Sequence, residues 1–475
     1  MKLLLVNPKN RVSLYGDYLW EPLSLAYVAA CRPVGWDVEL WDEQCAGDLP
    51  VEAVDADLVG ITAFTTQATR AYRIASDLRA RGIAVAMGGI HASLVRDEAL
   101  ARVDAIVTGE CETVFGELCR DFERGTLRRV YEGMAADLDG GAAGRVPAVR
   151  PDRSIFAKYR YEYASAQTTR GCPMDCSFCS VTAFNGKRFR MRDVGDVVAE
   201  LAAIEARDVI LVDDDLNGFS LRAKERCLRL FDAMAAAELG KSWVTQVTIN
   251  FGDDAELCRR ARAAGCAGVF IGLESPDTAS LARIRKDGKS RRRGLPYYRE
   301  NVARIHEAGI GVVGSFILGI DTQDMGTIAG DILRFAEEAR LDGLNPTILT
   351  PLPGTRDYAA YRDAGRILFT SYPEDWEKYT LAFPVTAMPH VSGAGLMRRY
   401  FDVLQFFRPE RVAELHRRTA SDVSPDAAWH AYLWNRAWTN FGLRNGVFRK
   451  SPRAASYPAA MPRVAPDRWD MAVAS

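Results

Sequence analysis

The first 125 residues alternate short apolar runs, rich in branched side chains, with segments of helical periodicity. Such runs are typical of strands buried in a parallel sheet, and the segments between them are typical of covering helices. This alternation predicts a Rossmann-like, doubly wound parallel sheet over residues 1–125. The expected strands are KLLLVN, DVELWD, DLVGITAF, IAVAMGG and VDAIVTGE, and the expected helices are PLSLAYVAACRPVG, TQATRAYRIASDLRARG and residues 113–124.

The alternation stops at residues 126–160 and returns at Tyr163. The interrupted stretch is rich in Gly, Ala and Pro, which is typical of a linker. Six further strand-and-helix units then predict a partial (β/α)6 barrel over residues 161–360, whose active site would lie at the C-terminal ends of its strands. The six expected strands are YASAQTT, DVILVDD, SWVTQVTI, GVFIGLE, GVVGSFILG and GLNPTIL.

Residues 361–475 are aromatic-rich and helical in pattern, and they end in a Pro- and Ala-rich stretch. We predict an α-helical C-terminal extension with a loose tail. Its tryptophans could line an apolar substrate pocket, but we favour a packed helical core. They are Trp376, Trp429, Trp434 and Trp438.

Composition narrows the class of protein. The 475 residues carry a net charge of −1, so the chain lacks the overall basic charge of nucleic-acid binders. No apolar run is long enough to span a bilayer, and MKLLLVNPKN reaches Asn and Pro too early for a signal peptide. We therefore expect a cytoplasmic protein with no transmembrane segment and no nucleic-acid partner.

Small or polar residues stand at the expected carboxyl ends of the first-domain strands. In doubly wound sheets, ligands bind beyond these ends. Each of the glycines is also compatible with an ordinary turn. The residues in question are Thr62, Gly88, Gly89, Gly109 and Glu110.

Three of the ten cysteines lie together as C-x3-C-x2-C, directly after the first expected barrel strand. They are Cys172, Cys176 and Cys179. A structural zinc site usually has four ligands, and no Cys or His nearby in sequence completes the set, although a distant residue could. Three thiolates suit a four-iron, four-sulfur cluster in which one iron stays open. The scattered cysteines are expected to be small buried residues.

The segment CPMDCSFC, in its strand-and-loop context, resembles the radical S-adenosylmethionine (SAM) superfamily. The resemblance implies that the three cysteines hold a [4Fe–4S] cluster whose open iron binds SAM, and that an electron from the cluster cleaves SAM to methionine and a 5′-deoxyadenosyl radical. It further implies SAM contacts from Phe178, from Asp213 and Asp214 in VILVDDDLNGF, and from Glu274 in VFIGLESPD. The alternatives are a helix cap or turn for the aspartates, and a salt bridge or cap for Glu274.

The segments WEPLSLAYVAA, GITAFT, GGIHAS and VTGECE resemble the first domain of cobalamin-binding radical SAM enzymes. The resemblance covers about residues 1–360, and the extension is similar to that of the hopanoid-methylase-like branch. It implies cobalamin contacts from the strand-end residues named above and from His91, for which a local hydrogen bond is the alternative. None of the five histidines fits D-x-H-x-x-G, so cobalamin would lack that ligand. A scaffold without cofactor is the alternative, although G-x-G-x-x-G is also absent.

Two basic runs follow the cysteines. KRFRMR contains Arg190 and Arg192, either of which could meet an acidic group of cofactor or substrate. RKDGKSRRR, residues 285–293, is expected to be an exposed loop insertion.

The resemblance implies an enzyme that transfers a methyl group to an unactivated carbon. The deoxyadenosyl radical would remove a hydrogen atom, methylcobalamin would deliver the methyl group, and a second SAM would restore it. No acid–base motif is visible, so no catalytic residue is assigned. Expected partners are a small-molecule substrate, for which an apolar character is one option, and an electron donor such as flavodoxin or ferredoxin. The alternatives are cyclisation or rearrangement with the same cofactors, and a non-catalytic, metal-stabilised binding protein.

Overall fold

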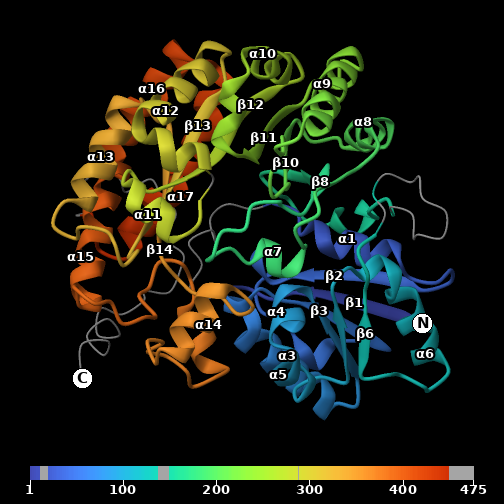
Figure 1. Cartoon of the computed structure of the whole chain (residues 1–475). Coiled ribbons are helices and arrows are strands. Elements are labelled where there is room, and N and C mark those ends of the chain that lie inside the picture. Colours follow the sequence, from blue (N-terminus) through green and yellow to red (C-terminus); the bar gives the residue numbers. More distant parts are fainter. Residues whose placement is uncertain (11–19, 137, 139–148, 287, 449–475) are drawn as a thin grey trace.

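Two parallel sheets, each with six strands, form the frame of the protein (Figure 1). The computed structural model describes residues 1–10, 20–136, 138, 149–286 and 288–448, so the predicted tail and part of the predicted linker lie outside the described residues. The first sheet has the strand order β2-β1-β3-β4-β5-β6. Its strands are β1 (Lys2–Asn7), β2 (Asp37–Asp42), β3 (Leu58–Thr62), β4 (Ala84–Gly88), β5 (Ala105–Thr108) and β6 (Val130–Glu132).

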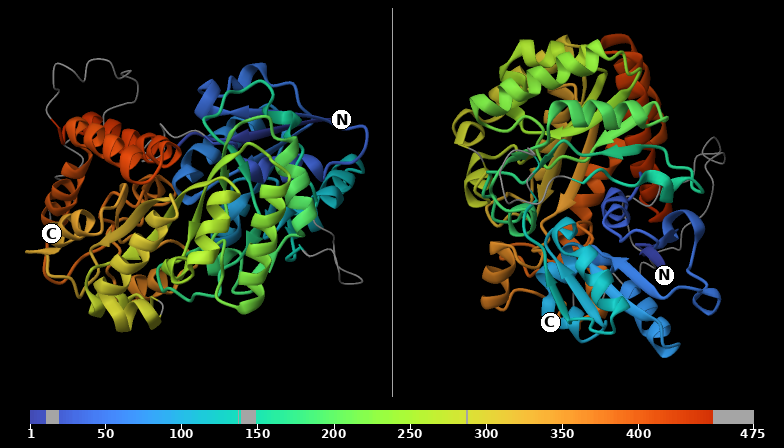
Figure 2. Two further views of the ribbon diagram at one scale, coloured as in Figure 1. Left: turned by 90° about the horizontal axis from the view of Figure 1, so that it is seen from above. Right: turned by 90° about the vertical axis from the view of Figure 1, so that its right-hand side faces the viewer.

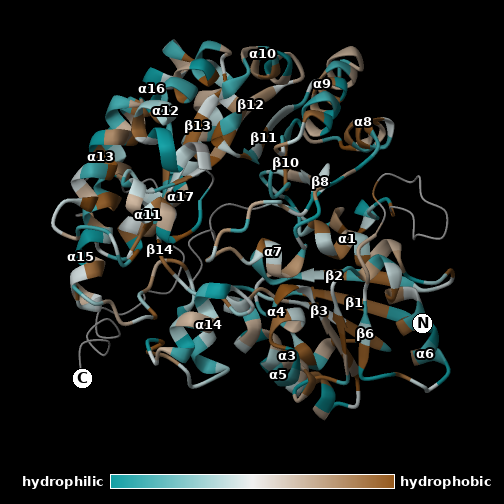
Figure 3. Cartoon of the chain, in the orientation of Figure 1, coloured by the Kyte–Doolittle hydropathy of each residue, from teal (hydrophilic) through white to brown (hydrophobic). Residues whose placement is uncertain are grey.

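Helices cover both faces of the first sheet, as a doubly wound fold requires. Successive residues of a strand point to opposite faces, so Leu5 packs with α1 and α6 while Val6 packs with α3. The predicted Rossmann-like sheet is therefore confirmed. Figure 3 shows its strands as predominantly hydrophobic. The helices are α1 (Leu23–Ala30), α2 (Glu43–Ala46), α3 (Ala68–Ala80), α4 (Gly89–Leu94), α5 (Arg96–Leu100) and α6 (Phe115–Glu123).

The segment predicted as a linker contributes structure of its own. Val130–Glu132 forms β6, which pairs in parallel with β5. The 3₁₀ helix η4 (Arg153–Phe156) places Ile155 and Phe156 in the core beside α1. A three-residue strand gives no detectable period, which is why the sequence pattern did not reveal it.

The second sheet has the strand order β14-β13-β12-β11-β10-β7, and all of its pairings are parallel. All six expected barrel strands are present, so the predicted partial barrel is confirmed. The strands are β7 (Ala164–Ala166), β10 (Asp208–Leu211), β11 (Ser242–Val247), β12 (Cys266–Glu274), β13 (Gly311–Leu318) and β14 (Gly343–Ile348). A small antiparallel pair, β8 (Thr169–Arg170) and β9 (Arg190–Met191), flanks the cysteine loop.

Most of the barrel helices lie on the outer side of this sheet, whereas the short helix after the cysteine loop and the helix after β14 lie beside the first domain (Figure 1). Among the described residues, no helix has both the length and the apolar character that a membrane crossing requires. The helices are α7 (Val181–Phe184), α8 (Val194–Ala203), α9 (Leu221–Ala236), α10 (Ala255–Ala263), α11 (Thr278–Arg283), α12 (Gly288–Glu307), α13 (Ile328–Glu338) and α14 (Arg356–Asp363).

The C-terminal extension packs against the barrel as a helical core. It contains η6 (Glu374–Lys378), α15 (Gly393–Leu404), α16 (Pro409–Asp422) and α17 (Pro425–Arg444), and α16 and α17 lie side by side (Figure 2). Trp434 contacts Phe270 of β12 edge to face, and its indole donates to the Leu344 carbonyl at 2.8 Å. Trp438 stacks on Phe407 with 5.3 Å between ring centroids. These contacts support the interpretation of Trp434 and Trp438 as packing residues, whereas Trp429 is exposed.

The extension also reaches the first domain. Trp376 of η6 is 1% exposed and lies in the core built around α3. Its ring is stacked on Tyr372 with 3.7 Å between centroids, and its indole donates to Glu98 Oε1 at 3.1 Å. His91 lies beside it, with the ring centroids 5.6 Å apart. This short segment therefore fastens the extension to α3, α4 and α5.

Replacement of Trp376 by alanine should lower the free energy of unfolding by about 3–5 kcal/mol, because the side chain fills a packed junction. The matched control is Trp429→Ala, since Trp429 is 41% exposed, and the expected loss there is about 1 kcal/mol or less. Thermal unfolding of both variants measures the difference. Equal losses in the two variants would show that the junction adds no stability.

Candidate functional site

The cysteine loop begins at a glycine that no other residue could replace without movement. Gly171 has φ +82°, and a Cβ atom there would lie 2.5 Å from the carbonyl oxygen of Arg188. A side chain is therefore excluded by both conformation and space. This glycine lets the chain leave β8 and turn into the loop that carries Cys172, Cys176 and Cys179, all of which are half-buried.

Burial disfavours the thiolate form of these cysteines in the metal-free chain. Burial raises the pKa of Cys172 to about 12, with further contributions from the Asp215 carboxylate and the two other thiols. Burial likewise raises the pKa of Cys179 to about 12. Thiols in this setting need a bound positive charge to ionise at neutral pH. A metal group that each sulfur can reach would supply that charge.

Within the described ranges, no three His, Cys, Asp or Glu side chains lie close enough together to hold one metal ion. A zinc site needs its ligands around a single ion. In an iron–sulfur cluster, by contrast, each thiolate binds a different iron. The three half-buried thiols on one loop fit that donor set, and their ligation of a cluster stays a prediction.

Two segments far away in the sequence hold the loop in place. The Ser177 amide donates to the Ile284 carbonyl at 3.1 Å, and the Asp357 amide donates to the Ser177 carbonyl at 3.1 Å. Arg356 Nη1 lies 2.6 Å from Asp175 Oδ2. The loop is thus fixed between the residues after α11 and the start of α14.

Asp213 and Asp214, predicted to contact SAM, brace the base of the same loop. Asp213 is fully buried and accepts hydrogen bonds from the amides of Thr168 and Thr169 at 2.6 and 2.9 Å. Asp214 accepts from the Gly171 amide at 3.2 Å and from Asn185 Nδ2 at 2.8 Å. Burial raises the pKa of both carboxyl groups. Their observed contacts are structural, and a role towards SAM stays a prediction.

Glu274 forms a buried ion pair, which is the salt-bridge alternative named for it, although its partner Lys286 was not predicted. Lys286 Nζ lies 3.0 Å from Glu274 Oε1, and both side chains are 9% exposed. Burial alone would lower the pKa of Lys286, but the charges of Glu274 and Cys176 raise it. A Cβ atom at Gly272 would lie 2.3 Å from Glu274 Oε1, so the pair needs glycine there. Glu274 has φ +66°, which is unusual for a non-glycine residue and marks a constrained strand end.

Lys286 belongs to the run that was expected to be an exposed loop insertion, and the structure corrects this expectation in part: Arg285 and Arg291 are exposed, but Lys286 is buried. The run spans the link after α11 and the first turns of α12, and Lys286 and Ser290 within it are buried. Charged runs usually lie in solvent, so no sequence signal marked this lysine as buried. Phe178 packs against the neighbouring apolar cluster of Ile284 and Ile317, and its predicted contact with SAM is untested.

A cavity of about 260 Å³ opens between the first domain and the barrel. Its walls include the carboxyl ends of β3, β4 and β5 together with barrel residues next to the cysteine loop. Five of the six residues predicted to contact cobalamin line it: Thr62, Gly88, Gly89, Gly109 and Glu110. The barrel side of the wall is formed by Gln167, Arg170, Phe184, Asn185 and Val212.

His91, the sixth residue, does not line this cavity. It is fully buried, and its Nε2 atom lies 2.9 Å from the Tyr72 hydroxyl and 3.6 Å from Glu98 Oε1. The prediction of a cobalamin contact is therefore corrected in favour of the local hydrogen bond. The first turn of α4 directs this side chain towards α3 and η6, which a strand-end pattern does not show.

A buried network of charges joins the cavity to the cysteine loop. Arg170, which precedes Gly171, lies 2.9 Å from Glu110 Oε2 and 2.6 Å from Glu112 Oε1. Arg190 also pairs with Glu110. Burial alone would raise the pKa of Glu110, but the Arg190 hydrogen bond and the Arg170 charge bring it below its ordinary 4.5. Glu110 thus stabilises the folded chain above about pH 4.5, and this contribution disappears on acidification.

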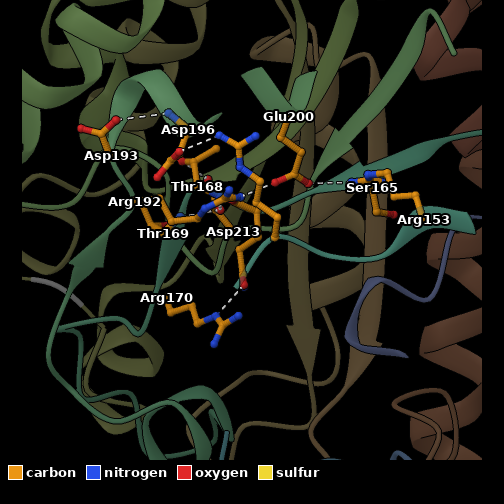
Figure 4. A network of polar contacts seen from close by, with 12 residues as sticks. Arg153, Ser165, Thr168, Thr169, Arg170, Arg192, Asp193, Asp196, Glu200 and Asp213 are labelled. Atoms are coloured by element: carbon orange, nitrogen blue, oxygen red, sulfur yellow. Dashed lines mark hydrogen bonds and ion pairs between the residues drawn. The ribbon is translucent and has the colours of Figure 1, made fainter. Parts of the chain in front are cut away.

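The arginines predicted to meet a cofactor or substrate meet protein carboxylates instead. Arg190 contacts Glu110, as above, and Arg192 Nη1 lies 2.6 Å from Glu200 Oε2. Figure 4 shows Arg192 in a polar network with Glu200 and Arg153, where Arg153 Nη2 lies 2.8 Å from Glu200 Oε1. These ion pairs fix β9 to the first domain through Arg190, and fix the residue after β9 to α8 through Arg192.

Comparison with known proteins shows the family of this chain. Residues 166–335 match the model of the radical SAM superfamily, and residues 14–119 match the model of the B12 binding domain. Bacteriochlorophyllide d C-12(1)-methyltransferase of Chlorobaculum tepidum is 31% identical, covering 80% of this chain and 81% of that protein. The chain belongs to the cobalamin-binding group of the radical SAM superfamily. Its cofactors are accordingly a [4Fe–4S] cluster, SAM and cobalamin, and radical SAM methyl transfer is the activity supported.

Other relatives of this enzyme widen the comparison. Anaerobic magnesium-protoporphyrin IX monomethyl ester cyclase of Rubrivivax gelatinosus is 25% identical over 81% of this chain and 73% of that protein. Hopanoid C-2 methylase of Rhodopseudomonas palustris is 25% identical over 73% of this chain and 65% of that protein. The structure of the radical SAM methyltransferase TsrM from Kitasatospora setae superposes with a TM-score of 0.59 at 18% identity, covering 84% of this chain and 85% of that one. That likeness shows the shared fold.

Replacement of Glu110 by glutamine should lower the thermal midpoint by about 3–8 °C, because two buried arginines lose a charged partner. The control is Glu132→Gln, whose side chain is 67% exposed in its pair with Arg96, and which should change the midpoint by about 1 °C or less. Differential scanning calorimetry at pH 7 compares the two. A Glu110 variant as stable as the control would show that the network does not hold the domains together.

Proposed function

We propose that this enzyme transfers a methyl group from cobalamin to an unactivated carbon of a small-molecule substrate. The observation that carries the proposal is a shared wall: the cavity at the first-domain strand ends is bounded by Arg170 and Asn185, and the same residues border the cysteine loop. A methyl donor held in the cavity and a radical formed at the loop would therefore act on a substrate between them.

Each region of the chain has a separate task in this proposal. When bound, the cluster and SAM supply the deoxyadenosyl radical, and cobalamin supplies the methyl group. The three cysteines would hold the cluster. Asp214, which accepts a hydrogen bond from the Gly171 amide at the start of the loop, and Glu274 would lie beside SAM. Gly88, Gly89 and Gly109 line the cavity at the strand ends, where the cobalamin ring would lie.

We propose a tetrapyrrole as the first substrate class to test. The relatives from Chlorobaculum tepidum and Rubrivivax gelatinosus are both named for tetrapyrrole substrates. We also propose a flavodoxin or ferredoxin as electron donor, since reductive cleavage of SAM needs an external electron.

A cytoplasmic location is proposed because all ten cysteines, each within the described residues, are free of disulfide bonds.

Replacement of Cys176 by alanine should remove the cluster and abolish 5′-deoxyadenosine formation. Anaerobic reconstitution followed by visible absorption and product analysis measures both. The control is Cys258→Ala, because Cys258 is buried on α10 away from the loop, and it should retain the full cluster content. A Cys176 variant that keeps its cluster and its SAM cleavage would contradict the assignment and favour a non-catalytic metal site.

A second candidate, radical cyclisation, is supported by the cyclase relative. Incubation with SAM labelled in its methyl group distinguishes the two. Methyl transfer predicts about one labelled methyl group per product molecule, whereas cyclisation predicts deoxyadenosine without label in the product. Mass spectrometry of the product from a tetrapyrrole substrate, with cobalamin present, gives the answer. Unlabelled product would favour cyclisation.

A further inference from the structure

Exposed cations from three separate segments gather at the outer edge of the cysteine loop. Lys187 Nζ lies 3.1 Å from Asp175 Oδ1, and Arg356 Nη1 lies 2.6 Å from Asp175 Oδ2. Arg285 Nη2 lies 4.0 Å from the same Oδ2 atom. Lys187 and Arg285 are each 61% exposed, and Arg356 is 42% exposed. Together with the exposed Arg188, these residues are called the basic rim.

The basic rim carries more positive charge than its carboxylate can balance. Asp175 contributes one negative charge, and three cations share it. The neighbouring Asp357 is buried and already contacts Ser177 and Arg283. The surplus charge therefore faces solvent, where it attracts an acidic surface.

The position of the basic rim is as informative as its charge. Asp175 lies between Cys172 and Cys176, so the rim is the solvent side of the loop predicted to hold the cluster. The hydrogen bonds of Ser177 to Ile284 and Asp357 hold this loop against the segments that bear Arg285 and Arg356. A protein docked on the rim would thus meet the cluster loop directly. Electron transfer favours such a short path.

We propose that the basic rim is the docking surface for a small acidic electron-transfer protein. The inference rests on the proposed function, because that function needs one electron for each SAM that is cleaved. The reduced donor gives up one electron and is oxidised, and the cluster accepts this electron and is reduced. Opposite charges on the two surfaces raise the association rate and set the orientation, as is general for such pairs.

Removal of two rim charges tests the proposal. The full chain with reconstituted cluster is titrated anaerobically with an acidic flavodoxin, and binding is followed by flavin fluorescence anisotropy at low and raised salt. Lys187→Gln combined with Arg285→Gln should weaken binding about tenfold at low salt and flatten the salt dependence. The charge-conserving pair Lys187→Arg with Arg285→Lys should bind like the unaltered chain.

A distant substitution serves as the matched control. Arg259 on α10 is 67% exposed, and Arg259→Gln should leave flavodoxin binding within about twofold of the unaltered chain. Circular dichroism and the visible spectrum of the cluster verify that every variant is folded and loaded. Equal binding by the rim variant and the unaltered chain, equal weakening by Arg259→Gln, or no flavodoxin binding at low salt would each overturn the proposal.

A chemical reductant separates this proposal from the proposed function. The unaltered chain, reduced with dithionite, should form 5′-deoxyadenosine without any protein donor. Failure of that reaction would contradict the radical SAM function. Success of that reaction, combined with flavodoxin binding that is indifferent to the rim charges, would overturn the docking surface and leave the function standing.

Discussion

The ion network around Arg170 is the interaction on which the rest of the site depends. The guanidinium of Arg170 is only 8% exposed. Its charge needs a neighbouring negative charge, because burial of a lone charge costs free energy. Glu110 and Glu112 compensate it from the first domain, while Arg170 itself belongs to the strand that leads into the cysteine loop. The network therefore sets how the two domains face each other. The two sides of the network depend on each other, since removal of either side leaves a buried charge without its partner.

This constraint explains how two sheets of similar architecture produce one site. Parallel sheets offer their ligand-binding positions at the carboxyl ends of their strands. The cavity is lined by such ends from both sheets: Thr62 and Gly88 from the first, and Gln167 and Val212 from the second. Two strand-end surfaces thus meet across a single space. The aromatic junction at Trp376 adds a second fastening from the extension, at a place distant along the chain from Arg170.

Much of this arrangement can be predicted from the sequence, and the features that could not be predicted share a physical cause. Buried strands give strong local signals, and the cysteine motif is local as well. The strand β6 was missed because it is too short to show a period. The residues that line the cavity could be predicted because strand ends are recognisable in the sequence. His91 and Lys286 could not be placed, since the groups beside them, Trp376 for His91 and Glu274 for Lys286, lie on other elements of the fold. Sequence pattern assigns a residue to an element, whereas the partner of a charged or aromatic group depends on tertiary packing.

The polar groups near the site are used mainly to hold segments together. Asp213 accepts from two backbone amides, Arg192 and Arg153 share Glu200, and Glu274 is paired with Lys286. A site that depends on proton transfer needs a base free to exchange its proton with substrate. A site whose cofactors carry the chemistry needs rigid placement and a space from which water is excluded. The ion pairs and hydrogen bonds described above meet the second requirement, because they hold segments in place. Rigid ion pairs are then a condition for the reaction, because a radical formed at one wall must meet a substrate carbon that faces the other.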